Sequence, residues 1–249
     1  MNKWLYRVLM VLLLGVLLFS GYHLGSELMQ IHRSTSLGQA LVEGAVESHA
    51  APQQTGQDSQ SLVPIHVDFD VLRQQAPDAI GWLYCPDTPI HYPVVQGKDN
   101  QFYLTHLADG TANCNGALFA DHKSAPDFSQ WNTFVYGHNM RSGNVLGTLP
   151  KYSQQEYYDQ HPLLWLLTPQ QDFLAEPAAG CVVTVDTPLY TLPATGEQAA
   201  ELVRQAMAQS TFAAELEPSD QDHWLTLSTC TNRADDERYL LIFRLTPVD

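Results

Sequence analysis

The chain has 249 residues, of which 45% are hydrophobic and 10% aromatic, enough to bury one sizeable core. Its 27 Asp and Glu residues outnumber its 12 Lys and Arg residues, which gives a formal net charge of −15. An acidic chain without a cluster of basic residues is not expected to bind nucleic acid, because contact with the phosphate backbone needs basic patches.

The N-terminal segment predicts a single transmembrane helix. Lys3 and Arg7 precede an apolar run, and no charged residue occurs between Arg7 and Glu27. As a helix, residues 8–24 measure about 25 Å, which crosses most of the hydrocarbon core of a bilayer. The two cations favour an N-terminus inside the cell and place residues 25–249 outside. A cleaved signal peptide is the alternative, but the apolar run is long for one and no cleavage site follows it closely.

We expect three parts in the chain: a membrane anchor over residues 1–24, a stalk or linker over 25–61, and a folded domain over 62–249. The stalk includes a polar, turn-forming run at 50–60 that would hold the domain off the membrane. Outside the anchor, 27 acidic side chains face 10 basic ones, a net charge of −17. No EF-hand-like spacing occurs among them, and Asp235-Asp236-Glu237 is interpreted as a solvated loop rather than a calcium site.

The folded domain is predicted to be mostly β. A short helix is expected from the capping residue Asp68 to Gln75. Apolar runs predict strands at about 80–84, 89–95, 116–120, 132–138, 163–168, 172–176, 180–186, 223–230 and 238–245. Strands this closely spaced, separated by Gly, Pro and Asn, indicate a barrel rather than βαβ units. One longer helix is expected to follow the capping box Thr195-Gly196-Glu197-Gln198.

The last two predicted strands flank the most informative motif. Residues 223–227 alternate in polarity and continue into Ser228-Thr229-Cys230-Thr231. After a polar loop, Arg238 opens the next strand. A nearby cation favours the thiolate, which is the reactive form of cysteine, and a guanidinium can bind an oxyanion. Cys230 is therefore a candidate nucleophile and Arg238 a candidate oxyanion ligand.

A histidine ends another predicted strand upstream. The run Phe134–Met140 places His138 directly after apolar strand residues. The near-neutral pKa of imidazole suits a general acid and base, so His138 completes a predicted acyl-transfer site. His122 is the second candidate for this role. Arg233 competes with Arg238, although it lies within the polar loop.

These motifs together resemble those of sortases, the cysteine transpeptidases of Gram-positive cell surfaces. The resemblance covers roughly residues 65–247 and points to the class B branch through the blocks at 79–83, 90–96, 99–104 and 116–121. It implies a closed β-barrel of about eight strands, with an N-terminal helix and one helix inserted before the penultimate strand. The domain over 62–249 would then be the catalytic domain.

The resemblance also implies a reaction. Cys230 would attack the threonyl carbonyl of a C-terminal sorting signal similar to NPxT-G or NPxT-N, and Arg238 would stabilise the oxyanion. His138 would protonate the departing amine. The thioester would then pass to an amine of a peptidoglycan precursor or to a pilin lysine. No metal or organic cofactor is implied. The partners would be a surface protein that carries the sorting signal, the amine acceptor, and the membrane through the N-terminal helix.

Further residues fall where class B enzymes line the substrate groove. These candidates are Tyr136, Asn100, Ser228, Thr229 and Thr231. The chain departs from the class just after the cysteine, where an acidic residue is common and Thr231 and Asn232 stand instead. This difference bears on substrate preference rather than on the chemistry.

Two other functions remain open at this point: a hydrolytic cysteine peptidase with the same site, and a non-catalytic surface binding module on the same barrel. The remaining cysteines, Cys85, Cys114 and Cys181, do not form a CxxC pair. One disulfide among them is possible, and a buried free thiol is the expected state of Cys181.

Overall fold

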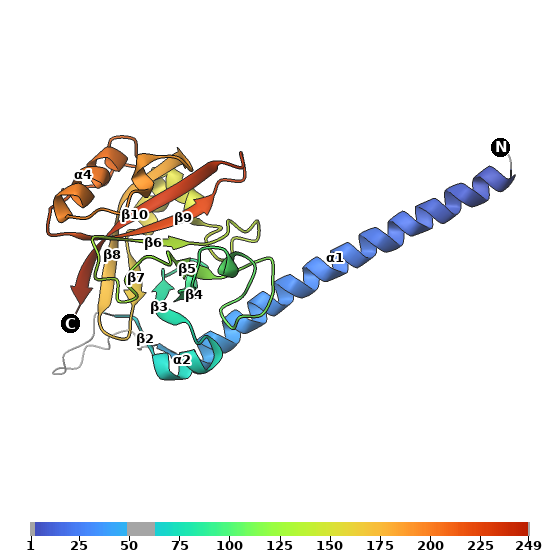
Figure 1. The fold of residues 1–249 in the computed structure, drawn as a ribbon, viewed down its shortest axis with the longest axis horizontal. Coiled ribbons are helices and arrows are strands. Elements are labelled where there is room, and N and C mark those ends of the chain that lie inside the picture. Colours follow the sequence, from blue (N-terminus) through green and yellow to red (C-terminus); the bar gives the residue numbers. More distant parts are fainter. Residues whose placement is uncertain (1–2, 49–62, 249) are drawn as a thin grey trace.

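The computed structural model describes residues 3–48 and 63–248. The polar run predicted at 50–60, and the predicted start of the folded domain at residue 62, lie outside these ranges. Figure 1 shows a barrel from which one long helix extends.

That helix, α1 (Lys3–Ala45), is unbroken over its whole length. Within the described part of the chain it is the one helix long and apolar enough to cross a membrane, by length and composition. The apolar side chains near its N-terminal end are exposed, as the prediction of a spanning helix requires. Its last turns differ, because Leu41 and Ala45 are only 2% and 4% exposed and pack into the core of the domain. The predicted boundary at residue 24 therefore falls inside a continuous helix.

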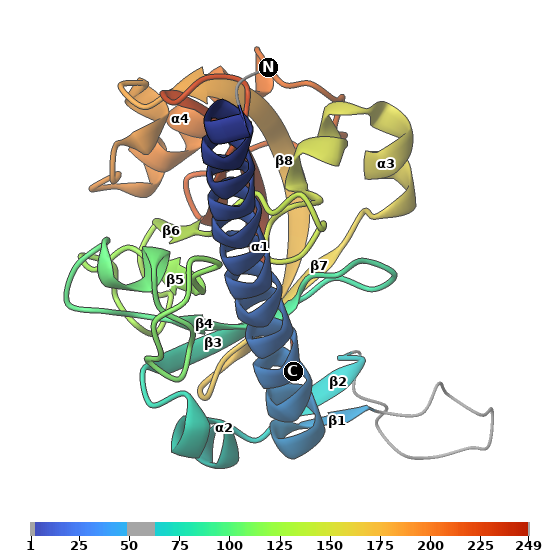
Figure 2. The same ribbon diagram turned by 90° about the vertical axis from the view of Figure 1, so that its right-hand side faces the viewer.

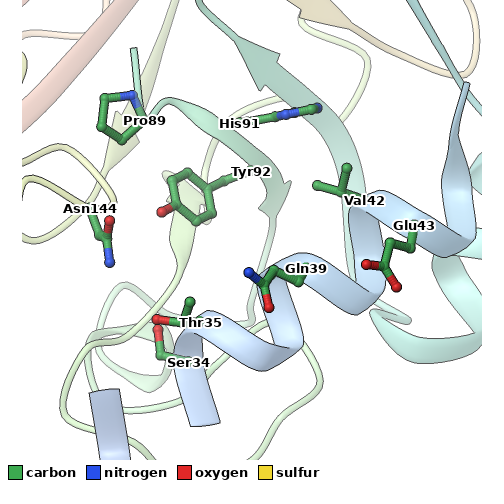
Figure 3. Close-up of a pocket in the computed structure, with 10 residues that line it drawn as sticks. Ser34, Thr35, Gln39, Val42, Glu43, Pro89, His91, Tyr92 and Asn144 are labelled. Atoms are coloured by element: carbon green, nitrogen blue, oxygen red, sulfur yellow. The ribbon is translucent and has the colours of Figure 1, made fainter. Parts of the chain in front are cut away.

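A groove of about 250 Å³ lies between the C-terminal part of α1 and the domain. Figure 3 shows Ser34 and Gln39 of α1 on one side of it and Pro89, Tyr92 and Asn144 of the domain on the other. The main chain after α1 adds a further link. It forms β1 (Val46–Ser48), which pairs antiparallel with β2 (Ile65–Val67). The helix and the domain thus share both a core and a small sheet.

The short helix α2 (Phe69–Gln75) follows β2 as predicted. Asp68 caps it by accepting hydrogen bonds from the backbone N–H groups of Asp70 and Val71, both at 3.0 Å.

Eight strands then close into a barrel, as the resemblance to sortases implies. They are β3 (Ala79–Tyr84), β4 (His91–Val95), β5 (Leu118–Ala120), β6 (Asn132–Tyr136), β7 (Leu164–Leu167), β8 (Asp172–Thr184), β9 (His223–Cys230) and β10 (Glu237–Val248). Their order around the barrel is β10-β8-β7-β3-β4-β5-β6-β9. The β4–β5 and β6–β9 pairs are parallel and the others antiparallel, so the barrel is mixed. Figure 1 and Figure 2 both show the C-terminal end of α1 beside α2, while the rest of the helix extends away from the barrel.

Helix α4 (Gly196–Met207) lies between β8 and the penultimate strand β9, where it was predicted. Thr195 caps it, since its hydroxyl accepts the backbone N–H of Gln198 at 3.3 Å. The apolar face of α4 packs on the outside of the barrel against β8 and β9.

Two of the predicted strands, 172–176 and 180–186, are a single strand. β8 continues through Pro177, which lacks an N–H group. The partner strand β10 shifts register between Ile242 and Phe243, opposite this proline, and the irregularity absorbs the missing ladder bond. The short helices η1 (Phe102–Leu104), η2 (Leu149–Ser153), α3 (Gln155–Gln160) and η3 (Pro188–Tyr190) were not predicted. Two of them, η1 and η3, contribute to the site described next.

Candidate active site

The β9–β10 ladder sets the relation between the predicted nucleophile and the predicted oxyanion ligand. Cys230 is the last residue of β9, and Arg238 is directly opposite it in the register of β10. Directly opposed residues in an antiparallel pair project from the same face, with Cβ atoms about 4.5–5.5 Å apart. The thiol and the guanidinium therefore emerge side by side. Arg233 is exposed in the loop between them and does not line the cavity that they share.

His138 reaches the same place from β6. This strand runs parallel to β9 with Tyr136 beside Ser228. His138 and Cys230 each lie two residues further along, so both strands end at the same edge of the barrel. The imidazole Nε2 is 2.8 Å from the carbonyl oxygen of Leu104, which requires a proton on Nε2 for a hydrogen bond. This contact leaves Nδ1 as the nitrogen that can exchange a proton with substrate.

One cavity of about 310 Å³ contains nearly the whole predicted site. Its walls are formed by Asn100, Leu104, Phe119, Tyr136, Gly137, His138, Ser228, Thr229, Cys230 and Arg238. Seven of the eight predicted site residues are among them. Thr231 is not, because its hydroxyl donates to the carboxylate of Glu237 at the base of the loop. His122 also lies outside this wall, exposed beside Asp121.

Hydrogen bonds between the ends of β6 and β9 hold Cys230 in place. The side-chain amide of Asn139 donates to the carbonyl oxygen of Cys230 at 2.8 Å. The buried hydroxyl of Thr229 donates to the carbonyl oxygen of Gly137 at 2.7 Å. Asn232, in the left-handed region with φ 61°, donates to the carbonyl oxygen of Asn139 at 3.1 Å. The candidate nucleophile Cys230 is thus held through its main chain rather than through its thiol.

Hydrogen bonds to its own loop hold Arg238 in place. Its Nη1 donates to the carbonyl oxygens of Asp235 at 2.8 Å and Glu237 at 3.0 Å. Among the described residues, its Nε and Nη2 groups make no hydrogen bond, so they remain available as donors toward the cavity. A guanidinium held in this way can bind a developing oxyanion without reorganising.

Tyr190 is a site residue that sequence reasoning missed. It ends η3, and its hydroxyl lies 2.6 Å from the hydroxyl of Ser228, one of the cavity walls. Burial raises the pKa of Tyr190, while the Ser228 hydrogen bond and the positive charge of Arg238 lower it and the nearby Cys230 raises it. The tyrosine is therefore close to both the thiol and the guanidinium. Thr187 before Pro188 signals a turn, but no local pattern places Tyr190 at the site.

Asp121 is a second residue whose contacts the sequence did not reveal. It follows β5 and is 9% exposed. Its Oδ2 accepts hydrogen bonds from the amide of Asn100 at 2.8 Å and from the hydroxyl of Tyr136 at 3.1 Å. Burial and then the charge of Asp121 raise the pKa of Tyr136, which keeps that phenol protonated. Two cavity side chains thus share one carboxylate oxygen.

All four cysteines are free thiols, which answers the pairing question that the sequence left open. Cys85 and Cys181 are buried, whereas Cys114 is exposed and Cys230 half-buried. Burial raises the pKa of Cys181 to about 12, so this thiol stays protonated and unreactive. It is the buried free thiol that the sequence predicts.

The chain is similar in sequence and fold to known sortases. No model of a protein family matches it. It is 28% identical to sortase B of Listeria monocytogenes over 247 residues, which is 98% of this chain and 96% of the relative. Among solved structures, sortase B from Bacillus anthracis in complex with AAEK1 has a TM-score of 0.72 at 23% identity, over 88% of this chain and 99% of that one. A Staphylococcus aureus sortase B–substrate complex has a TM-score of 0.68 at 21% identity, over 73% and 85%.

The sequence likeness, together with the closed barrel, supports an enzyme of the sortase type, a cysteine transpeptidase. Because the likeness extends over nearly the whole chain, it supports more particularly a sortase B-like protein. The fold and the enzyme type predicted from the sequence are thereby confirmed.

Proposed function

We propose that this protein cleaves a C-terminal sorting signal after threonine and transfers the new acyl end to an amine. The Cys230 thiolate attacks the threonyl carbonyl carbon, and the carbonyl electrons move onto oxygen. Collapse of this tetrahedral intermediate breaks the C–N bond and leaves a thioester on Cys230. An incoming amine attacks the thioester and releases the thiolate. Two easier steps replace one difficult amide exchange.

The observation that carries the proposal is the alignment of Cys230 and Arg238 across β9 and β10, with His138 on the same cavity wall. Arg238 is proposed to stabilise the oxyanion with its free donors. His138 is proposed to protonate the departing amine and later to deprotonate the incoming one. The hydrogen bond of its Nε2 to the carbonyl oxygen of Leu104 supports Nδ1 as the atom that would exchange this proton.

The remaining cavity residues are proposed to bind the sorting peptide. Tyr136, Asn100, Ser228 and Thr229 line the wall and offer hydrogen-bonding groups. Thr231 is proposed to act indirectly, by holding Glu237 at the start of β10.

Residues 1–24 are proposed to anchor the protein in the membrane as a single pass, with residues 25–61 as a connecting segment and residues 62–249 as the extracellular catalytic domain. One long apolar helix at the N-terminus supports the anchor. Figure 1 supports a further point, since β9 ends and β10 begins on the side of the barrel from which α1 extends. The site would then open toward the bilayer, where a membrane-held sorting protein and a lipid-linked wall precursor are found. A pilin lysine is the alternative acceptor.

The test uses the full chain in detergent micelles with internally quenched peptides that carry NPxTG, NPxTN or LPxTG motifs. Each peptide is incubated with and without triglycine or a lysine-containing amine, and the products are identified by mass. We expect cleavage after threonine, with the amine joined to the new end, and none with Cys230→Ala. Cys114→Ala is the matched control, because it removes an exposed thiol outside the cavity and should leave turnover unchanged.

Two outcomes would contradict the proposal. Cleavage with water as the only acceptor would identify a hydrolytic peptidase on the same residues. Cleavage that persists in Cys230→Ala would remove Cys230 from the reaction altogether.

A further inference from the structure

Asp121 accepts hydrogen bonds from two side chains that line the cavity, Asn100 and Tyr136. Its Oδ2 accepts from Asn100 and from Tyr136, and its Oδ1 accepts from the backbone N–H of Lys123 at 2.9 Å. The carboxylate is itself held by its main chain, since its backbone N–H donates to Phe134 on β6 at 2.9 Å. Three donors therefore converge on a nearly buried group whose place is fixed by the sheet.

The bond to Tyr136 determines what this phenol can offer a substrate. A hydroxyl has one proton and two acceptor lone pairs. The proton of Tyr136 is committed to Asp121, so the oxygen faces the cavity as an acceptor. Such an oxygen is complementary to an N–H group of a bound peptide and not to a carbonyl.

The orientation of Asn100 is fixed from both ends. Its Oδ1 accepts the backbone N–H of His122 at 2.9 Å, and its Nδ2 donates to Asp121. A flipped amide would place two donors together at His122 and two acceptors together at Asp121. Asn100 therefore keeps one orientation, and its second Nδ2 proton is available to the cavity.

We propose that Asp121 is a positioning residue of the substrate groove, which holds Tyr136 as a hydrogen-bond acceptor for a peptide N–H and holds Asn100 in one orientation. The proposal rests on the proposed function and adds a residue that does not touch the reacting atoms. Asp121 acts on peptide binding, so it governs KM, while the thiol, imidazole and guanidinium that govern kcat are untouched.

The test substitutes Asp121→Asn in the full chain in detergent micelles. A carboxamide has one oxygen, so it cannot accept from Lys123 on one side and from Asn100 and Tyr136 on the other. We expect KM for the cleaved peptide to rise about tenfold, the effect of one charge-assisted hydrogen bond, with kcat within about twofold of wild type. In the Tyr136→Phe background the same substitution should raise KM by much less, because the phenol that it positions is gone.

Asp172→Asn is the matched control. Asp172 is also a partly buried carboxylate that accepts a backbone N–H, from Thr168 at 3.2 Å, but it lies away from the cavity. Its replacement should leave KM unchanged. A wild-type KM in Asp121→Asn, or an equal rise in KM with and without Tyr136, would overturn the proposal.

A second readout needs no turnover, so it separates this proposal from the proposed function. The hydroxyl of Tyr136 donates to Asp121 at 3.1 Å. In protein with carbon-13-labelled tyrosine rings, the Cζ signal of Tyr136 should therefore shift in Asp121→Asn relative to wild type. A signal that stays at its wild-type position would show that Asp121 does not hold this hydroxyl, whether or not peptides are cleaved.

Discussion

Arg238 lies directly opposite Cys230 in the β9–β10 ladder. Their relation is set by strand register rather than by the loop that joins them. The loop can therefore vary in length and sequence while the guanidinium remains beside the thiol. Arg233 is much closer to Cys230 in sequence but has no such constraint, since it is exposed within the loop.

The first prediction concerns this pair. Arg238→Lys keeps the charge but loses the planar fork of donors, so kcat should fall by about 100-fold or more, as for other oxyanion ligands, with KM little changed. Arg233→Lys is the control and should retain wild-type kcat. Steady-state kinetics on the cleaved peptide measures both. A large loss in Arg233→Lys with normal activity in Arg238→Lys would exchange their roles.

The second prediction concerns the thiols. An alkylating reagent should modify the exposed Cys114 and the half-buried Cys230, and leave the buried Cys85 and Cys181 intact. Burial raises the pKa of both Cys85 and Cys181, so neither forms thiolate near neutral pH. Peptide mass mapping after timed labelling gives the result. Loss of activity should follow the modification of Cys230 alone, so the Cys114→Ser variant should lose activity at the wild-type rate.

The third prediction tests the hydrogen bond between Thr229 at the end of β9 and Gly137, which follows β6. Thr229→Val removes the hydroxyl that donates to the carbonyl of Gly137 and leaves that acceptor unpaired, which should lower the free energy of unfolding by about 1–3 kcal/mol. Thr133→Val is an equally buried control on β6, and its hydroxyl has no hydrogen-bond partner among the described residues. That variant should be neutral or slightly stabilising. Urea denaturation compares the two, and equal effects would show that the Thr229 hydrogen bond contributes nothing specific.

The fourth prediction concerns acid stability. Burial lowers the pKa of His91 from its ordinary 6.5, and its Nε2 is buried without a hydrogen-bond partner among the described residues. Below pH 6.5 the unfolded chain binds a proton that the folded chain does not, so stability falls as the pH drops from 6.5 toward the folded pKa. Above pH 6.5 this effect is absent.

His91→Gln should remove that part of the pH dependence, as followed by urea unfolding on both sides of pH 6.5. His223→Gln is the control, because the ring of His223 has a partner in the carbonyl of Gln130 at 3.0 Å. An unchanged acid slope in His91→Gln would assign the effect to other groups.

The fifth prediction concerns the end of α1. Leu41→Ala should lower the free energy of unfolding by about 2–5 kcal/mol, because this side chain is 2% exposed in the core shared with the domain. Leu28→Ala on the same helix should have little effect, since Leu28 is 57% exposed. Thermal unfolding of the full chain in micelles measures both. Equal stability of the two variants would mean that α1 is not docked in solution.

Much of the candidate site could be predicted because the sequence patterns that indicate it involve residues close together in the chain. Cys230, His138 and Arg238 each stand at the edge of an apolar strand, and the strands themselves follow from alternation and turn residues. Tyr190 and the role of Asp121 could not be predicted in this way. Their partners Ser228 and Asn100 lie far away in the chain and meet them only after the barrel has closed.

One detail of the predicted strands was wrong, because a local signal conflicted with long-range pairing. Pro177 predicts a break between two strands, yet β8 is continuous because it pairs with β10 on both sides of this proline. The apolar run ends near residue 24, and the helix continues beyond it to Ala45, where Leu41 and Ala45 pack into the core of the domain.

The unbroken helix α1, fixed to the domain at one end, has a geometric consequence for a protein held at a bilayer. Residues 27–29 of α1 are exposed and lie just before Gln30, which hydrogen-bonds to the domain. Every residue added to or removed from this stretch changes the distance between bilayer and domain by about 1.5 Å along the helix axis and turns the domain by about 100° around it. The distance of the domain from the bilayer and its rotation about the helix axis therefore change together. An insertion of about 18 residues, which is five full turns, would restore the original rotation of the domain while moving the cavity some 27 Å away from the membrane.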